Sequence, residues 1–381
     1  MILKTAQFKK LANKILFAAE VDKNAANLEL VTKDNFLYLN VTNKEYYVSI
    51  RYQLDEAEEF RATVDAALFL NLISGINTDT FELAAKNNNI IVKVGKSNYK
   101  LAMIYENDQL LTLPKIIITN KTVEMSISNE ILQSILNVNG REIAKIKNKK
   151  INNVNPLQLV YYLDQDGAFT FTTGSCLNKF KLDQPIQIIL TDRIVKLFKL
   201  FDEDPYFSCG HDIVYNDSVQ TKISFETSDI YIAAIVNHDD KAITGIQGPY
   251  RATKQFIETT YDNHIVVAAD ILNAAITRIM QFTKNSISNA DMTLLPAEVH
   301  LNNDEITIID PQENTEVLVA ENASYTNGEY IMKVNLPDLK SVLDSCKSEH
   351  ITINCGNHRS VIIHRGNISN VIPELHPKAS I

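Results

Sequence analysis

The sequence contains few cysteines and no long apolar run. Four cysteines occur among 381 residues, and their spacing matches neither a disulfide framework nor a zinc ribbon. We therefore expect reduced, small hydrophobic side chains at Cys176, Cys209, Cys346 and Cys355. The sequence also has no stretch of 18 apolar residues, which is about the length needed to span a membrane. The chain begins with a short strand and a lysine-bearing helix rather than a signal peptide, which predicts a cytoplasmic location.

Motifs of the common enzyme classes are also missing. The sequence has no Walker A loop, no G-x-G-x-x-G, no H-E-x-x-H and no G-x-S-x-G nucleophile elbow. Cys209 and His211 have no second ligand pair at metal-binding spacing, which favours a buried thiol beside a loop histidine. The acidic run 202–204 follows a basic helix and indicates a solvated loop rather than a catalytic carboxylate pair. We predict a protein that is not an enzyme and that needs no metal or cofactor.

Positive charge is in deficit over the whole chain. The sequence has 37 Lys and Arg against 46 Asp and Glu, a net charge of -9. This balance argues against a protein that coats nucleic acid through a dense basic surface, although it leaves room for one weakly basic face. The Lys-rich and Asn-rich tract 145–153 is expected to be a hydrated loop.

One supersecondary pattern occurs three times in the chain. Each copy has a short strand, an amphipathic helix, alternating strands, and a strand that leads through a polar cap into a second helix. Apolar residues at helical spacing predict the first helix of each copy. They are Phe8, Leu11, Ala12, Ile15 and Ala19 in copy one, Ile131, Leu132, Ile135 and Leu136 in copy two, and Ile271, Leu272, Ala275, Ile276 and Ile279 in copy three.

The second helix of each copy is predicted from a capping side chain after an apolar strand residue. The caps are Asp65, Thr191 and Asn335, and Pro337 lies just inside the third helix, where proline is tolerated. The caps are spaced by roughly a third of the chain, which indicates duplicated domains rather than a solenoid.

Helices that alternate with antiparallel hairpins predict an α+β fold. We expect three repeated domains, each with two helices packed on antiparallel sheets, over 1–119, 120–250 and 251–381. The joints are expected near 119–121 and in a loop over 245–251. The turn at 33–35 is expected to join two strands of the first copy.

Lysine and arginine lie on helix positions opposite the predicted core. Lys10 and Lys14 are four residues apart in the first copy, and Arg193, Lys196 and Lys199 share a face in the second. One such stripe alone indicates ordinary surface. Stripes on equivalent helices of repeated domains would gather on one side of an assembly and add their potentials.

Three α+β copies without a catalytic motif resemble the bacterial replication sliding clamps, the β subunits of DNA polymerase III. The resemblance covers essentially the whole chain and is most specific in the segments 94–99, 172–174 with Leu177, and 371–375. It implies the DNA clamp fold, with three domains forming half of a six-domain, head-to-tail homodimeric ring. Such a ring would encircle duplex DNA without reading its sequence and would tether the replicative polymerase. The protein would then be located in the cytoplasm, associated with the nucleoid.

The resemblance implies a DNA-facing set of cations on helices that line the ring. That set is Lys10, Lys14, Arg193, Lys196, Lys199, Arg278 and Lys340, with Lys145, Lys147, Lys149 and Lys150 in a copy-two loop that approaches DNA. A ring that slides needs weak attraction to phosphates, because tight ion pairing would stall it.

The resemblance also implies a hydrophobic pocket between the second and third domains. The pocket would bind short linear motifs of the polymerase and the clamp loader through Leu157, Thr172, Gly174, Leu177, Pro249, Val371, Ile372, Pro373 and Leu375. Pro249 is expected there from the interdomain loop. The dimer contact is expected to join Tyr99 and Met103 of copy one to Met280 and Phe282 of copy three.

The chain departs from the family pattern in several places. Ser175 and Cys176 stand where the family usually has His and Arg, and the helix over 65–74 carries no cation. Residues 376–381 extend past the usual end. The departures fit a divergent phage or plasmid member. They also leave open a clamp-like peptide-binding adaptor that no longer encircles DNA, and a hydrolase with an unrecognised site.

Overall fold

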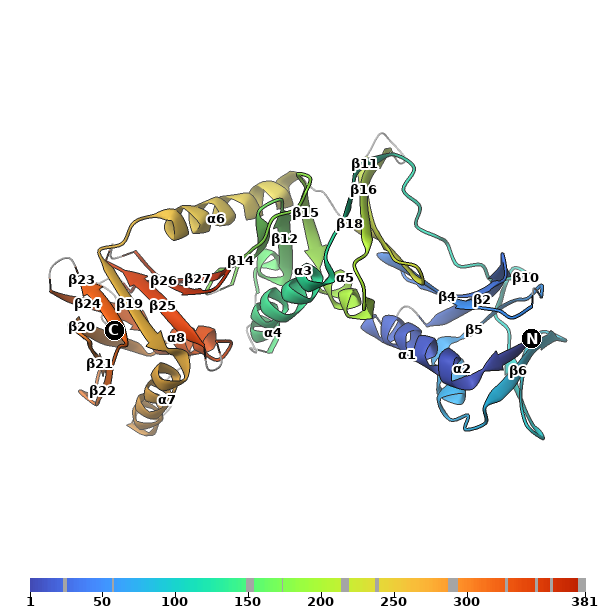
Figure 1. Cartoon of the computed structure of the whole chain (residues 1–381), viewed down its shortest axis with the longest axis horizontal. Helices are drawn as coiled ribbons and strands as arrows, with labels where there is room; N and C mark the ends of the chain where they lie inside the picture. Colours follow the sequence, from blue (N-terminus) through green and yellow to red (C-terminus); the bar gives the residue numbers. More distant parts are fainter. Residues whose placement is uncertain are drawn as a thin grey trace. The chain divides into compact units, whose positions relative to one another are not determined.

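A computed structural model describes residues 1–22, 26–56, 58–148, 154–172, 174–213, 219–236, 240–286, 294–325, 328–346, 349–356 and 359–375 (Figure 1). The chain forms two compact units. The first contains the described residues among 1–133, 183–186 and 190–238, and the second those among 134–182, 187–189 and 239–381. The middle third of the chain therefore contributes to both units. The boundaries 1–119, 120–250 and 251–381 stay a prediction.

The first unit is built on an eight-stranded antiparallel sheet in the order β11-β16-β17-β18-β4-β3-β2-β5. Its strands are β11 (Lys121–Ser126), β16 (Tyr206–Ile213), β17 (Val219–Glu226), β18 (Ile230–Val236), β4 (Tyr46–Gln53), β3 (Phe36–Thr42), β2 (Asn27–Lys33) and β5 (Arg61–Asp65). Strands β18 and β4 pair from Ile230 against Ile50 to Ala234 against Tyr46. Hydrogen bonding thus joins the first and second copies in one sheet.

Smaller sheets and the helices complete the first unit. A four-stranded sheet has the order β1-β6-β7-β8, and β9 pairs with β10. These elements are β1 (Ile2–Lys4), β6 (Thr80–Lys86), β7 (Asn89–Val94), β8 (Ser97–Ala102), β9 (Tyr105–Glu106), β10 (Gln109–Leu110), α1 (Thr5–Val21), α2 (Ala66–Ser74), α5 (Asp192–Leu197) and η3 (Phe198–Leu200). Phe8 of α1 is fully buried and contacts Tyr52, Phe69 and Phe81 edge to face. The predicted apolar stripe of this helix therefore faces the core.

The second unit has a nine-stranded sheet in the order β15-β12-β13-β14-β27-β26-β25-β19-β23 and a four-stranded sheet in the order β22-β21-β20-β24. The first contains β15 (Gln187–Thr191), β12 (Val160–Asp164), β13 (Gly167–Thr170), β14 (Cys176–Lys179), β27 (Ile368–Pro373), β26 (Ser360–Arg365), β25 (His350–Cys355), β19 (Asn263–Ala268) and β23 (Asn322–Tyr325). The second contains β22 (Thr315–Val319), β21 (Glu305–Ile309), β20 (Pro296–Asn302) and β24 (Glu329–Asn335). Pairing of β14 with β27 joins the second and third copies.

Helices cover both faces of the larger sheet of the second unit. They are α6 (Asp240–Glu258), α7 (Ala269–Ser286), α8 (Leu336–Leu343), α4 (Gly140–Asn148), the π-helical turn η1 (Ile135–Asn139) and the 3-10 turn η2 (Pro156–Leu159); α3 (Asn129–Ser134) lies where the two units meet along the chain. Figure 1 shows α6 along one side of β26 and β27, with α7 and α8 toward the other. Two core clusters result. Val371 belongs to the α6 side and Ile372 to the α7 and α8 side, because successive strand residues point to opposite faces.

Two of the three predicted caps bind the backbone of their helix. Asp65 accepts a hydrogen bond from the Leu68 amide at 2.8 Å, and Thr191 accepts one from the Ile194 amide at 3.5 Å. Asn335 occupies the third cap position but makes no capping bond. Its side chain instead accepts from the Leu295 amide and donates to Asp338, so it fastens the helix start to a neighbouring segment.

Two predicted loops are wrong. Residues 245–251 lie inside α6, with Pro249 in the helix interior, and Lys145 and Lys147 lie in α4 rather than in a hydrated loop. The predicted turn at 33–35 is confirmed: Asp34 and Asn35 have φ of 50° and 61°, which joins β2 to β3 in a tight hairpin.

The described residues contain no cluster of three or more potential metal ligands. All four cysteines are buried and free, as predicted. Burial raises the pKa of Cys209 to about 11, so this thiol stays protonated at neutral pH. Among the described residues, none of the helices has the length and apolar character needed to cross a membrane.

Candidate nucleic-acid and partner interfaces

The cations of α1 and α5 lie close to carboxylates of the first unit. Lys14 Nζ is 2.6 Å from Asp202 Oδ2 and donates to the Leu200 carbonyl at 2.9 Å. The hydrogen bond from Lys14 lowers the pKa of Asp202, so this carboxylate stays charged at neutral pH. Lys10, one turn earlier on α1, is exposed. The tip of Lys14 is therefore already engaged within the protein.

Arg193 at the start of α5 reaches across to the first copy. Its guanidinium is 3.0 Å from Glu45 Oε2 and 3.3 Å from Asp22 Oδ2. The hydrogen bond to Glu45 and the nearby Asp22 raise the pKa of Arg193. Thr191 also hydrogen-bonds to Glu45. Glu45, in the turn that precedes β4, therefore contacts both Thr191 and Arg193.

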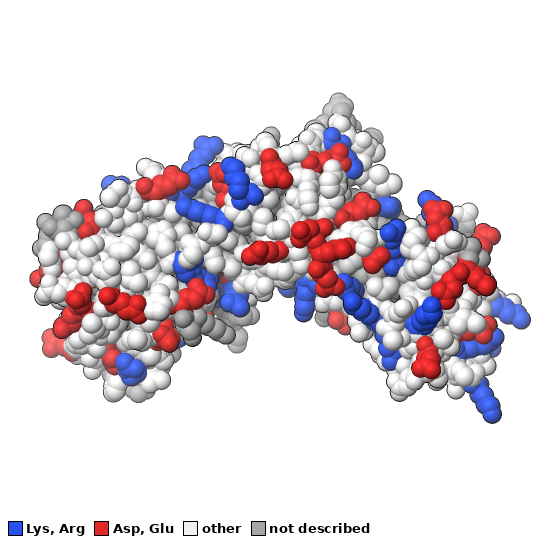
Figure 2. Space-filling model, in the orientation of Figure 1, with Lys and Arg blue, Asp and Glu red and all other residues white. Residues whose placement is uncertain are grey.

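Five further cations of the predicted DNA-facing set also contact groups of the protein. Each of five has an anionic or aromatic partner in its own unit. The pairs are Lys196 with Asp192 at 2.8 Å, Lys199 over the Phe17 ring at 5.3 Å, Arg278 with Glu316 at 2.8 Å, Lys340 with Asp344 at 2.7 Å, and Lys145 with Glu142 at 2.7 Å. Figure 2 shows basic and acidic side chains interspersed on the visible face. Most of the predicted cations thus carry partners that weaken their attraction for phosphate.

Lys145 is one of the more enclosed of the predicted cations. Its ammonium also hydrogen-bonds to the Ser341 carbonyl of α8, and Glu142 is buried. Lys147 on the same helix is exposed. Lys149 and Lys150 lie outside the described residues. Within this lysine tract, Lys147 is therefore the described side chain best placed to reach a ligand.

The predicted peptide-pocket residues fall into two groups. Leu177 and Val371 are buried in one cluster, with Leu157 packed half-buried against it. Thr172 and Gly174 lie instead beside α8, where Val342 and Ser341 line the same small hollow. Gly174 has no room for a side chain, because a Cβ there would be 2.9 Å from Val342 Cγ2.

Two neighbouring residues of the predicted pocket, Val371 and Ile372 on β27, point to opposite faces of the sheet. Ile372 is fully buried in the core under α7 and α8, so its side chain lies on the opposite face from Val371. Pro373 is exposed at the end of β27, and Leu375 is half-buried, with its amide donating to the Lys333 carbonyl at 2.8 Å. Residues 376–381 lie outside the description.

Helix α6 covers the apolar surface around Leu177 and was missed from the sequence. Ile246, Tyr250 and Ile257 are buried on it in the cluster that contains Leu177 and Val371. The Tyr250 ring centroid is 5.0 Å from that of Tyr162. The 4,3,4 spacing of Ile246, Tyr250, Thr253 and Ile257 was a helical signal, but Gly245, Gly248 and Pro249 concealed it. Pro249 is half-buried within this helix.

The first predicted dimer surface lies at a sheet edge. Tyr99 is on β8, which ends the four-stranded sheet order, and Tyr99 is exposed while Met103 is half-buried. Leu68 of α2 is 67 % exposed and lines the same hollow as Tyr99 and Leu72. A strand that pairs on one side only, beside an exposed leucine, is the kind of edge that pairs with another chain.

The second predicted dimer surface has a similar edge. Phe282 of α7 is 60 % exposed, whereas Met280 is 8 % exposed and belongs to the core. Strand β22 ends the other four-stranded sheet order and exposes Val317 and Val319. Arg278 of α7 donates two hydrogen bonds to Glu316 of β22, at 2.9 and 2.8 Å. These bonds direct Arg278 toward this edge strand.

Comparison with known proteins identifies the fold. No family model matches the sequence. Over 104 residues the chain is 31% identical to the beta sliding clamp of Mycoplasmopsis pulmonis; the matched part is 24% of this chain and 27% of that protein, so it spans about a quarter of the curated relative.

Solved structures match over nearly the whole chain. The DNA polymerase III subunit beta from Pseudomonas aeruginosa superposes with a TM-score of 0.72 at 15% identity, covering 99% of both chains. The beta subunit from Streptococcus pyogenes gives 0.71 at 14% identity, over 98% of this chain and 99% of the other. The Helicobacter pylori beta clamp bound to a DNA ligase peptide gives 0.68 at 13%, over 99% of both. The chain therefore has the fold of DNA polymerase III beta subunits.

Proposed function

We propose that this protein is a DNA sliding clamp, a binding protein that forms a homodimeric ring around duplex DNA and tethers the replicative polymerase. The observation that carries the proposal is the match of the fold to beta subunits over 99% of the chain. The short local identity to a beta sliding clamp supports the same assignment. The proposal retains the three domains 1–119, 120–250 and 251–381.

The charge pattern supports sliding rather than tight binding. A protein that forms many direct phosphate contacts releases counterions and gains affinity that depends strongly on salt. Cations already paired with carboxylates, such as Lys14 with Asp202, make fewer such contacts. We assign Lys10, Lys14, Arg193, Lys196, Lys199, Lys340 and the lysines of 145–150 to weak attraction of DNA, with Arg278 directed toward its sheet edge.

The partner at the two sheet edges is proposed to be a second copy of the chain. Strand β8 carries Tyr99 and Lys100 and lies beside exposed Leu68, and β22 carries exposed Val317 and Val319 beside Glu316. Both edges carry apolar residues, and Lys100 on β8 is opposite in charge to Glu316 on β22. These features suit strand addition between copies, in which β8 of one chain pairs with β22 of another. Head-to-tail addition at both edges closes a ring of two chains.

Light scattering tests the dimer. The wild-type chain of 42.9 kDa is expected to run at about twice that mass at micromolar concentration. Tyr99→Arg and Val319→Arg are expected to give monomers, because each places a charge in the apolar part of the contact. Ile117→Arg changes an apolar side chain that is 55% exposed away from these edges, and it should stay dimeric. A monomeric wild type would overturn the ring.

The partner-peptide site is proposed around Leu157, Thr172, Gly174, Leu177, Pro249, Val371, Ile372, Pro373 and Leu375. The half-buried and exposed members, Leu157, Pro373 and Leu375, are the ones a peptide can reach directly. Access to Leu177 and Val371 requires movement of α6, whose Ile246 and Tyr250 pack on them. Two leucine-sized anchors would each contribute about 1.5–3 kcal/mol, and together with a few backbone hydrogen bonds they suit exchangeable micromolar binding.

A polymerase C-terminal peptide tests this site by calorimetry. Leu157→Ala and Leu375→Ala are expected to weaken binding by about tenfold, whereas Val317→Ala on β22 should leave it unchanged. Truncation at Val371 is unsuitable, because β27 pairs with both β14 and β26. If all three variants bind the peptide with the wild-type affinity, the peptide binds elsewhere on the protein.

A further inference from the structure

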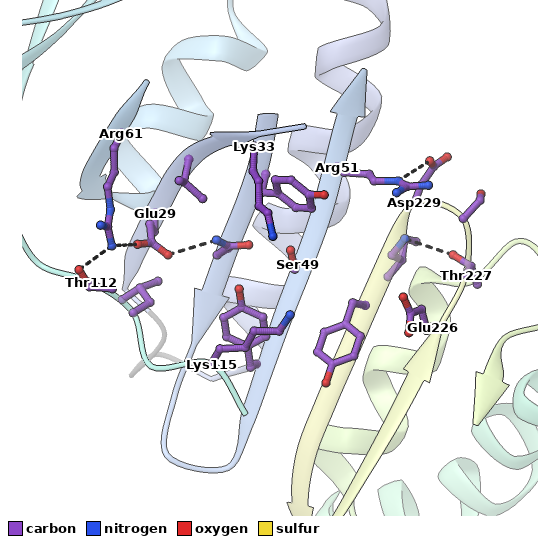
Figure 3. A pocket seen from close by; sticks show the side chains of 18 residues that line it. Glu29, Lys33, Ser49, Arg51, Arg61, Thr112, Lys115, Glu226, Thr227 and Asp229 are labelled. Atoms are coloured by element: carbon purple, nitrogen blue, oxygen red, sulfur yellow. Dashed lines mark hydrogen bonds and ion pairs between the residues drawn. The ribbon is translucent and has the colours of Figure 1, made fainter. Parts of the chain in front are cut away.

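A hollow of about 590 Å³ lies against one face of the eight-stranded sheet of the first unit. Its floor comes from β2, β3, β4 and β18, one wall from residues 112–115 and another from residues 226–230 (Figure 3). The volume lies within the range of small-molecule sites. The residues proposed above to contact DNA, a second copy or a peptide do not line it.

The floor holds a buried acceptor without a partner. Asn40 is 3% exposed, and its Nδ2 donates to Glu29 Oε2 at 3.1 Å. In this orientation its Oδ1 is buried with no hydrogen-bond partner among the described residues. Arg61 donates to the other Glu29 oxygen at 3.1 Å and so holds the carboxylate in place. Both oxygens of Glu29 are therefore engaged by donors of the protein.

Two lysines approach the middle of the hollow from different elements. Figure 3 shows Lys33 and Lys115 reaching toward it from opposite sides, with Ser49 between them. Lys115 Nζ lies 4.7 Å from the centre of the Tyr231 ring, which positions its ammonium. Lys33 is exposed, and its neighbour Asp34 is 3.9 Å away.

Most carboxylates of the lining are already balanced by arginine. Glu29 pairs with Arg61 at 3.1 Å, and Asp229 lies 3.7 Å from Arg51. Arg51 also stacks over Phe36, at 4.4 Å from the ring centre, and its buried Nε, which faces Asp229, makes no hydrogen bond to any residue that the structure describes. Glu226 is the remaining carboxylate of the lining. The lining thus has two lysines and two arginines against three carboxylates, an excess of one positive charge that favours an anionic ligand.

Aromatic rings complete the lining. Tyr38, Tyr47 and Tyr231 all face the hollow, and the rings of Tyr47 and Tyr231 meet edge to face at 6.3 Å. Such rings provide flat apolar surface on which a heterocycle can stack. The strands of the floor are interior strands of the sheet, so an extended peptide finds no free strand edge to pair with.

We propose that this hollow binds a nucleoside phosphate. The base would stack on the tyrosines, and the phosphate would lie between Lys33 and Lys115. A free nucleotide and the end of a single DNA strand offer this same chemistry. An acidic peptide lacks the stacked ring and is disfavoured.

Titration calorimetry of the full chain with adenosine monophosphate tests the site. Binding is expected with a dissociation constant below about 1 mM. Lys33→Ala and Lys115→Ala should each weaken it about tenfold, because each removes a charge-assisted contact to phosphate. Lys44→Ala, an exposed lysine outside the lining, should leave it unchanged. Circular dichroism checks that each variant keeps its fold.

Three further titrations decide the ligand class. Adenosine should bind at least tenfold more weakly than the monophosphate. A five-residue deoxyadenylate strand that binds more tightly, with the same dependence on Lys115, would assign the site to single-stranded DNA. Equal binding of adenosine and the monophosphate would overturn the proposal. So would affinities that do not change in the two lysine variants, or binding of a polyglutamate peptide but not of the nucleotide.

Discussion

Lys14 Nζ lies 2.6 Å from Asp202 Oδ2, so a cation predicted to face DNA is held by a carboxylate of the next copy. The consequence for DNA binding can be measured. Asp202→Asn removes this charge and leaves Lys14 with the neutral Leu200 carbonyl as its acceptor. The affinity for duplex DNA is expected to rise, and the slope of log K against log salt to steepen by about 0.9 for each lysine that gains a phosphate.

The matched control for that variant is Glu203→Gln. It changes the net charge equally, but Glu203 accepts hydrogen bonds from Ser228 rather than from a lysine. Its salt dependence should equal that of the wild type. If both variants steepen the slope to the same extent, overall charge and not the Lys14 pair controls DNA attraction.

The contact of α6 with the sheet is predicted to contribute strongly to stability. Tyr250 is buried against Tyr162 and Phe169, with ring centroids 5.0 and 5.5 Å apart. Tyr250→Ala should lower the free energy of unfolding of the second unit by about 3–5 kcal/mol, measured by urea denaturation. Arg251→Ala, at the next and exposed position, should change it by less than about 0.5 kcal/mol. A small effect of Tyr250→Ala would mean that α6 is only loosely attached.

Acid sensitivity should be traceable to Asp212. Its ion pair with Lys222 at 2.8 Å and its hydrogen bond from Thr119 lower its pKa to about 2. Because the folded pKa is depressed, the stabilisation is present above the ordinary value of 3.8 and is lost as the pH falls from about 4 toward 2. Asp212→Asn should lower the free energy of unfolding at pH 7 by about 1–3 kcal/mol.

The variant should also lose less stability than the wild type between pH 4 and pH 2, in unfolding measured across that range. Asp34→Asn is the control, because its carboxylate is exposed on the β2–β3 turn. It should follow the wild-type pH profile. An Asp212→Asn profile parallel to the wild type throughout would show that this pair does not carry the acid response.

Much of the fold could be predicted from local sequence. The α1 stripe, the caps at Asp65 and Thr191, and the hairpin turn at Asp34 each rest on neighbouring residues, so propensity and periodicity suffice. The helix α6 could not be recognised in this way. Its glycines and Pro249 disfavour a helix, and burial of Ile246 and Tyr250 on a sheet outweighs that local preference.

The sites were harder to predict because they depend on distant partners. The helical spacing of Arg193 identified a surface cation, but its carboxylate Glu45 lies far away in the sequence. Ile372 was grouped with Val371 because the two are adjacent, yet adjacent strand residues face opposite layers. Pairing and strand orientation are set by the tertiary structure, which local patterns do not contain.

Retention of the protein on circular and on linear DNA tests whether it encircles the duplex. The wild-type protein is loaded on a nicked circular plasmid and separated from free protein by gel filtration, before and after one cut linearises the plasmid. We expect the protein to stay with the circle at high salt and to be lost from the linear form, because a ring slides off an open end. Equal retention on both forms would contradict encirclement and favour a clamp-like adaptor that binds without enclosing DNA.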